Sequence, residues 1–229
     1  MSRPTAPRGR TGRPPATSRA EILAATRRLI DQDGWDKLTV RRLAAELGIG
    51  ATTLYHHVQD KADLLLLLIH EYAEQIPRPE LPSDPRDRIV AAAVAMHDAL
   101  AGWTWAAEVL TTDGFLARLS DSARWPVEAV LVGAVDHGCT PEQAVYLFRS
   151  IWYYTVGEIL VRAHSAGGRP DRERAAGGEA SSGGLGASDL PRLAEIGDQW
   201  VVLAAQDTYA QGLQAFVDGL LAQARTAAP

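Results

Sequence analysis

Residues 38–61 read LTVRRLAAELGIGATTLYHHVQDK, and they predict two short helices separated by a tight turn. Thr39 has the side chain of a helix N-cap, and the apolar residues at 40, 43, 44 and 47 repeat with helical spacing until Gly48. A second short helix is expected over residues 51–57, with Leu54 on its inner face. Two short helices joined in this way form a helix-turn-helix.

The flanking sequence predicts one helix before this motif and one after it. Ser18 and Glu21 have the spacing of a capping box, and a helical apolar stripe follows them until Gly34. Downstream, a longer helix should run from Asp60 to about Ile76, because the four prolines between residues 77 and 85 prevent its continuation. The helix-turn-helix therefore lies within a small helical domain.

Beyond the prolines the sequence predicts more helices and no strands, so we expect an all-α fold. One helix carries an apolar face from Ile89 to Leu100, and another starts at about Pro126. Thr140, Pro141 and Gln143 supply an N-cap, a first-turn proline and a capping box for a helix of about six turns.

The C-terminal third is expected to contain a loop followed by two helices. Residues 165–189 include seven glycines and predict a flexible loop. Helical patterns resume near Leu190, and a last helix carries apolar residues from Tyr209 to Leu221.

Charge is distributed unevenly along this chain of 229 residues, whose net charge is −5. Residues 1–61 contain eleven Arg and Lys against six Asp and Glu, whereas the remainder is strongly acidic. Residues 1–17 carry four arginines, Arg10 and Arg13 among them, with almost no large apolar side chain, and predict a flexible basic arm. A basic N-terminal module on an acidic body suggests that the module binds a polyanion.

Several classes of protein are disfavoured by the sequence. The single cysteine, Cys139, forms no internal disulfide and suits a reducing compartment, so a cytoplasmic location is expected. No apolar run approaches the roughly 20 residues that span a bilayer, so no membrane association is expected. The chain offers no nucleophile with a base and no phosphate-binding glycine loop, and the adjacent His56 and His57 lack the spacing of metal ligands. We therefore expect no enzyme, no metal and no cofactor.

The helix-turn-helix carries side chains suited to duplex DNA. Arg41 and Lys61 can bind phosphates, while Thr52, Thr53 and Tyr55 lie on the helix that would enter the major groove. Solvated polar residues of any small helical domain are the alternative interpretation, which the nearby basic arm disfavours.

Residues 18–62 resemble the DNA-binding domain of the TetR family of bacterial repressors, above all in residues 38–48 and 53–61. The segments 136–144 and 154–157 resemble the C-terminal domain class of the tetracycline repressor. The resemblance implies a DNA-binding domain over residues 18–62, after the arm of residues 1–17. It also implies an effector-binding and dimerisation domain over residues 63–229. The homodimer would be a four-helix bundle of the helices from Thr140 and about Asp207 with their symmetry mates.

The resemblance also assigns candidate residues. The DNA-binding candidates, with the two arm arginines added, are Arg10, Arg13, Arg41, Ala51, Thr52, Thr53, Tyr55, His57 and Lys61. Ala51 departs from the family pattern, because a methyl group replaces an amide that reads a base, so the operator sequence does not transfer. Residues 106–119 lack the histidine and the Arg-Pro pair of the tetracycline–magnesium site. The ligand-binding candidates are Met96, His97, Trp103, Phe148 and Trp152, which favour an apolar or aromatic effector.

The sequence therefore predicts a ligand-responsive transcriptional repressor, a homodimer that binds double-stranded operator DNA and is released by a small molecule. Two alternatives stay open. One is a regulator of the same family without an effector, and the other is a helical enzyme or carrier with a basic N-terminus.

Overall fold

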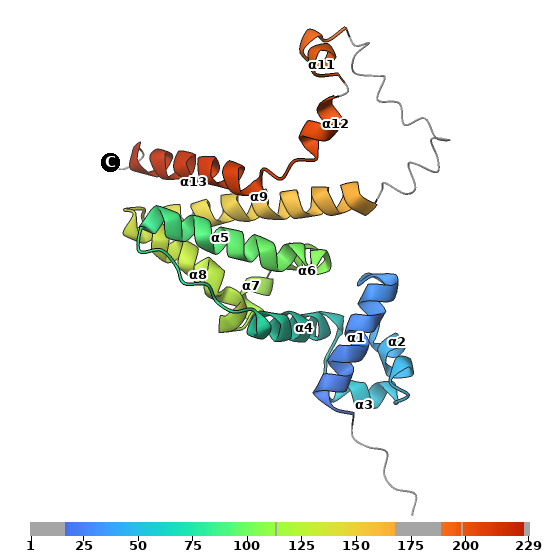
Figure 1. Cartoon of the computed structure of the whole chain (residues 1–229). Coiled ribbons are helices and arrows are strands. Elements are labelled where there is room, and N and C mark those ends of the chain that lie inside the picture. Colours follow the sequence, from blue (N-terminus) through green and yellow to red (C-terminus); the bar gives the residue numbers. More distant parts are fainter. Residues whose placement is uncertain (1–16, 113, 168–188, 198, 227–229) are drawn as a thin grey trace, which may run out of the picture. The chain divides into compact units, whose positions relative to one another are not determined.

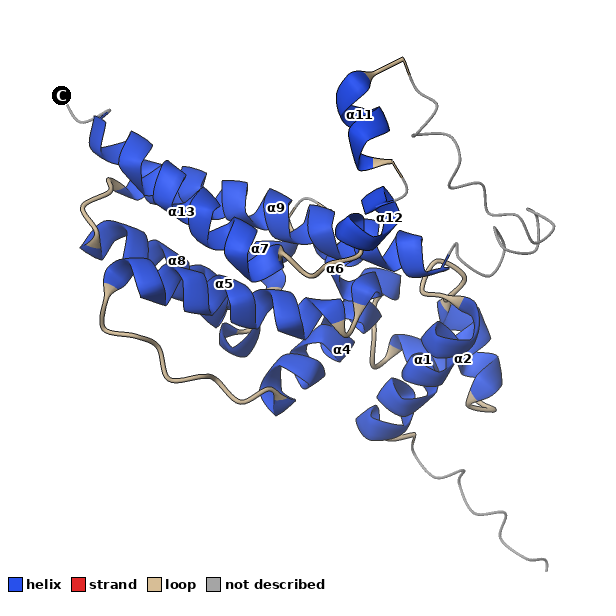
Figure 2. Cartoon of the chain, turned by 45° about the horizontal axis from the view of Figure 1, so that its top comes forward, coloured by secondary structure: helices blue, strands red, loops and turns tan. Residues whose placement is uncertain are grey.

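A computed structural model describes residues 17–112, 114–167, 189–197 and 199–226, and it contains helices and no strands within these ranges (Figures 1 and 2). The expected all-α fold is therefore confirmed. The chain divides into two compact units, residues 1–68 and 69–229. Residues 1–16, which are all but the last residue of the expected basic arm of residues 1–17, lie outside the described ranges.

The first unit contains α1 (Arg19–Asp33), α2 (Val40–Glu46), α3 (Ala51–Tyr55) and the beginning of α4 (Lys61–Gln75). The expected caps are confirmed: Glu21 N–H donates to the Ser18 hydroxyl at 3.2 Å, and the Thr39 hydroxyl accepts from Arg42 N–H at 3.1 Å. These caps satisfy amide groups that the first helical turn leaves without partners. The core of the unit is made by apolar side chains from all four helices, with Ile22, Leu43, Leu54 and Leu64 almost fully buried.

The turn between α2 and α3 depends on Gly48. Its φ of 66° lies in the left-handed region, which a residue with a Cβ adopts only at a cost. The turn is closed by Ile49 N–H, which donates to the Ala44 carbonyl oxygen at 3.0 Å. With the chain reversed here, Leu54 of α3 reaches the core and the rest of α3 faces outward.

The second unit is built on a pair of helices, α5 (Pro85–Ala101) and α8 (Asp121–Asp136), which lie side by side in both views (Figures 1 and 2). Gly133 of α8 allows their close approach. A Cβ at this position would lie 2.7 Å from Ile89 Cγ1 and 2.9 Å from the Pro85 carbonyl oxygen. Two short helices, α6 (Thr104–Leu110) and α7 (Phe115–Arg118), connect the pair.

The long helix α9 (Pro141–Gly167) packs against α5 and α8, and α13 (Tyr209–Thr226) runs along it (Figure 1). The expected start of α9 is confirmed by a reciprocal capping box, in which Thr140 N–H donates to Gln143 Oε1 at 2.8 Å and Gln143 N–H donates to the Thr140 hydroxyl at 3.3 Å. In the sequence, α11 (Pro191–Ile196) and α12 (Gln199–Ala204) come between α9 and α13.

Some expected boundaries are wrong. The helix expected to start at Pro126 begins at Asp121, and Pro126 lies inside it, buried against the core. The expected loop of residues 165–189 begins too early, because α9 continues to Gly167, and residues 168–188 lie outside the described ranges. Helices α6 and α7 were not predicted from the sequence.

Within the described residues no single helix is both long and apolar enough to cross a membrane. Only α5 and α6 taken together, with a bend of 113° between them, meet that test of length and composition.

Candidate nucleic-acid interface and ligand cavity

Helix α3 presents a polar outer face on an apolar anchor. Leu54 is fully buried, whereas Thr52, Thr53 and Tyr55 are exposed, and half of the tyrosine surface is accessible. Ala51, at the first position of the helix, is partly buried and offers only its methyl group. A helix of five residues with short hydroxyl side chains and one phenol pointing outward has the size and the donors to meet base edges and phosphates in a major groove.

The two neighbouring arginines of α2 have different surroundings. Arg42 forms an ion pair with Asp33, whereas Arg41 is exposed and makes no hydrogen bond or ion pair with any described residue. The guanidinium of Arg41 therefore has all its donors available to an outside anion.

Lys61 lies at the first position of α4 and is partly buried. Its Nζ donates to the Asp36 carbonyl oxygen at 3.0 Å and lies 4.8 Å from the centre of the Trp35 ring. Burial lowers the pKa of this amine, an effect that the carboxylate of Asp36 partly opposes. These contacts hold the ammonium group in one place at the start of the helix.

The structure thus brings five of the expected DNA-binding residues to the exposed surface of the first unit: Arg41, Thr52, Thr53, Tyr55 and His57. The arginines of the arm, Arg10 and Arg13, lie outside the described residues.

The second unit contains an apolar cavity of about 180 Å³. Its walls come from the end of α4 and from α5, α6, α7, α8 and α9. Its largest side chains belong to Met96, Trp125, Phe148 and Trp152. Apart from the hydroxyl of Ser122 and the indole N–H groups, the lining side chains are apolar, so the cavity suits an apolar group of a ligand.

Three of the five candidate ligand residues meet at this cavity: Met96, Phe148 and Trp152. Trp103 does not line it, because its ring stacks on Tyr72 with 3.9 Å between ring centres. Trp125, which was not among the sequence candidates, lines the cavity from the first turns of α8. Its large aromatic side chain could have indicated a ligand-binding residue. However, α8 was expected to start at about Pro126, one residue after Trp125.

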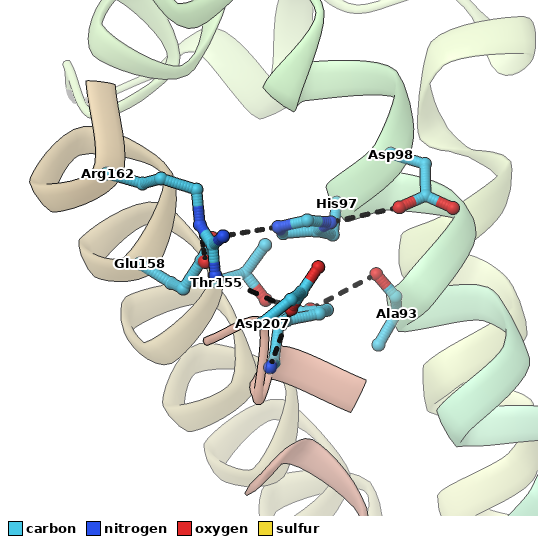
Figure 3. A network of polar contacts seen from close by, with 8 residues as sticks. Ala93, His97, Asp98, Thr155, Glu158, Arg162 and Asp207 are labelled. Carbon is cyan, nitrogen blue, oxygen red and sulfur yellow. Dashed lines mark hydrogen bonds and ion pairs between the residues drawn. The ribbon is translucent and has the colours of Figure 1, made fainter. Parts of the chain in front are cut away.

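His97 also lies away from the cavity, in a polar network that joins α5 to α9 (Figure 3). Its Nε2 lies 2.8 Å from Glu158 Oε2 and its Nδ1 lies 3.0 Å from Asp98 Oδ1, while Arg162 pairs with the other oxygen of Glu158. The imidazole ring stacks on Tyr209, with 3.8 Å between ring centres.

Tyr209 connects this network to the first turn of α13. Its hydroxyl shares a hydrogen bond of 2.8 Å with Thr155, and burial raises the pKa of the phenol far above its ordinary value, so it stays protonated. The same hydroxyl donates to the Ala93 carbonyl oxygen at 3.4 Å, so one phenol links α5, α9 and α13.

Comparison with known proteins gives a family match for each of the two units. Residues 22–68 match the family described as "Bacterial regulatory proteins, tetR family", and residues 78–224 match the "Tetracyclin repressor-like, C-terminal domain". The chain is 28% identical to the tetracycline repressor protein class A of transposon 1721 from Escherichia coli, over 87% of this chain and 88% of that one. It is 34% identical to an HTH-type transcriptional regulator of Saccharopolyspora erythraea, but the match spans only 43% of this chain and 42% of that regulator.

Among solved structures, the fold is similar to that of ActR from Streptomyces coelicolor in complex with actinorhodin. The TM-score is 0.71 at 22% sequence identity, covering 93% of this chain and 99% of ActR. The second family match alone spans more than half of the chain. The chain therefore belongs to the TetR family: it is a DNA-binding transcriptional regulator with a tetracycline repressor-like C-terminal domain, and it is not an enzyme.

Proposed function

We propose that this regulator is a repressor whose homodimer binds a near-palindromic operator and is released by a small apolar or aromatic effector. The observation that carries the proposal is the apolar cavity of the second unit, because Ala73 of α4 and Ile76, which directly follows α4, form part of its wall. Helix α4 begins at Lys61, next to the DNA-facing surface, and crosses the boundary between the two units. A ligand in the cavity therefore touches the helix that connects the two functions of the chain.

On DNA, we assign the base-facing positions to Ala51, Thr52 and Thr53 and the phosphate contacts to Arg41, Tyr55, His57 and Lys61. Exposure supports this division, since the threonines lie on the outer face of α3 and Arg41 has no partner among the described residues. Two recognition helices of a dimer would enter successive major grooves.

The dimer interface we propose uses α9 and α13. Four large apolar side chains of α9 are exposed, from Val145, Tyr146, Tyr153 and Val161, while Phe148 and Trp152 of the same helix line the cavity. One helix thus has a ligand face and an uncovered apolar face, which a second copy would bury. The dimer is typical of the family.

Release would follow from unequal effector affinity for two arrangements of the dimer, of which only one spans both half-sites. The relatives support a ligand-responsive repressor: one is a tetracycline repressor and ActR was crystallised with actinorhodin. The cavity of this chain differs in lacking the metal-binding pattern, so we assign it an apolar or aromatic ligand rather than tetracycline with magnesium.

The proposal is tested by footprinting the intact protein on DNA flanking its own gene, followed by a thermal-shift screen of small molecules. We expect a protected near-palindrome, and at least one compound that both stabilises the protein and lowers its affinity for that DNA. A protected site that no stabilising compound can release would contradict the effector part of the proposal and leave the regulator part standing.

A further inference from the structure

A second, more open cavity of about 820 Å³ adjoins the apolar cavity. The two share Leu116, Trp125 and Val127 as lining residues, so a single molecule can extend from one into the other. Unlike the inner cavity, the outer one is lined by charged side chains, from Arg78, Asp121, Arg124 and Glu128. A ligand that fills both needs an apolar part and a polar part.

The two arginines of the outer cavity come from different segments. Arg78 follows the end of α4, and its Nη2 lies 3.5 Å from the Asp121 carbonyl oxygen, with no carboxylate partner among the described residues. Arg124, on α8, pairs with Asp121 at 2.8 Å. The Asp121 side chain is 94% exposed, so this pair is screened by solvent and contributes little. An anion can therefore displace it and gain bidentate contacts to guanidinium.

The acidic side chains of the same cavity, from Asp121 and Glu128, influence the charge of a bound ligand less than the two arginines do. Asp121 forms an ion pair with Arg124, so a ligand cation would have to compete with that guanidinium for the carboxylate. Glu128 is exposed and lies one turn beyond Arg124, with no ion pair to any described residue. The cavity thus holds two guanidinium groups and two carboxylates, of which Arg124 and Asp121 pair with each other. Arg78 has no carboxylate partner among the described residues, so an anion can bind its guanidinium without displacing an acid and can form two parallel hydrogen bonds to it.

We propose that the effector is an amphipathic anion, with an apolar ring or branched acyl group in the inner cavity and a carboxylate, or a similar oxyanion, between Arg78 and Arg124. The inference rests on the proposed ligand cavity and specifies the chemical class of its ligand. The size of the inner cavity supports it, because an apolar protein cavity of about 150 Å³ binds benzene. The apolar part therefore has roughly the volume of one substituted ring.

Three probes that share the same apolar part test the charge: 4-tert-butylbenzoate, 4-tert-butylbenzamide and the cation 4-tert-butylbenzylammonium. Their dissociation constants are measured on the intact protein by ligand-observed NMR titration. The proteins are the wild type, the double variant R78Q/R124Q, the cavity variant W152A and the control R192Q. Arg192 is matched to Arg124, since it forms an exposed pair with Glu195 at the same spacing and distance, and it does not line either cavity.

In the wild type we expect the benzoate to bind about tenfold more tightly than the amide, and the ammonium to bind most weakly. R78Q/R124Q should remove the benzoate advantage and leave the amide within about twofold, R192Q should change nothing, and W152A should weaken both.

Equal affinities of benzoate and amide, tighter binding of the ammonium, or an equal loss of both neutral and anionic probes in R78Q/R124Q would overturn the inference. If W152A weakens the binding of the probes in those cases, the result still supports the proposed ligand cavity. Binding that W152A leaves unchanged, or no saturable binding of any probe, would contradict the cavity and the inference together.

Discussion

Replacing Arg41 by alanine removes a cation that has no partner within the described part of the chain. No intramolecular ion pair is lost with it, so the folded state should keep its stability. If Arg41 contacts a phosphate, its removal weakens binding to every DNA sequence alike, because phosphates carry no base identity.

The size of the effect follows from counterion release. Each phosphate contact contributes about 0.9 to the slope of log K against log salt on duplex DNA, and a dimer has two copies of Arg41. The slope should therefore become shallower by about 1.8. If the contact energy is mainly counterion release, the affinity loss is about 60-fold at 0.1 M salt and about 20-fold at 0.2 M salt.

The assay is fluorescence anisotropy with the footprinted operator and with an unrelated duplex of equal length, from about 0.1 to 0.3 M salt. R42A is the matched control, since Arg42 is the next residue of the same helix and pairs with Asp33. We expect R42A to change the slope clearly less than R41A. An unchanged slope in R41A, or a loss confined to the operator, would refute the assignment of Arg41 to a phosphate.

Four further predictions concern the cavity, the arm, the core and the cysteine. Replacing Trp152 by alanine should raise the effector concentration needed for release, measured by operator anisotropy, with near-normal operator affinity in its absence; failure to dimerise would instead make Trp152 an interface or core residue. Deleting residues 1–16 should weaken DNA binding while sedimentation still shows a dimer, and unchanged affinity at low salt would reduce the arm to a solubilising tail. Replacing Gly133 by alanine should lower the free energy of unfolding by about 1–3 kcal/mol in urea titrations, because its Cβ would meet the Pro85 carbonyl oxygen at 2.9 Å; an unchanged midpoint would show that α5 and α8 can separate freely. Burial raises the pKa of the Cys139 thiol, so iodoacetamide at about pH 8.5 should alkylate it more slowly than free cysteine until the protein unfolds, and equal rates would contradict its burial.

Much of the fold could be predicted from the sequence. The starts of α1, α2 and α9 were identified from Ser18, Thr39 and Thr140, because a cap is a contact between residues three positions apart. The turn at Gly48 is equally local. The start of α8 was predicted wrongly at Pro126, because proline is typical of a first helical turn. In the structure Pro126 is buried inside α8, five residues after its first residue, Asp121.

The candidate sites divide in a similar way. The sequence identified the exposed face of α3, because Leu54 is the apolar residue of a short polar helix whose spacing then places its neighbours outward. It named Arg41 and not Arg42 through the family resemblance, but the ion pair of Arg42 with Asp33, on another helix, was found only in the structure.

The sequence alone therefore determined the family, the helical class and the starts of α1, α2, α4 and α9, because these depend on period and on contacts within one turn. Only the tertiary structure decided which aromatic side chains line the cavity. The ring of Trp103 stacks on Tyr72 and does not line the cavity. His97 contacts the carboxylate of Glu158, which lies 61 residues further along the chain. Trp125 took a place in the cavity wall. The physical reason is that a side chain in a packed interior contacts whichever residues the fold brings next to it, and their separation in sequence carries no information about that distance.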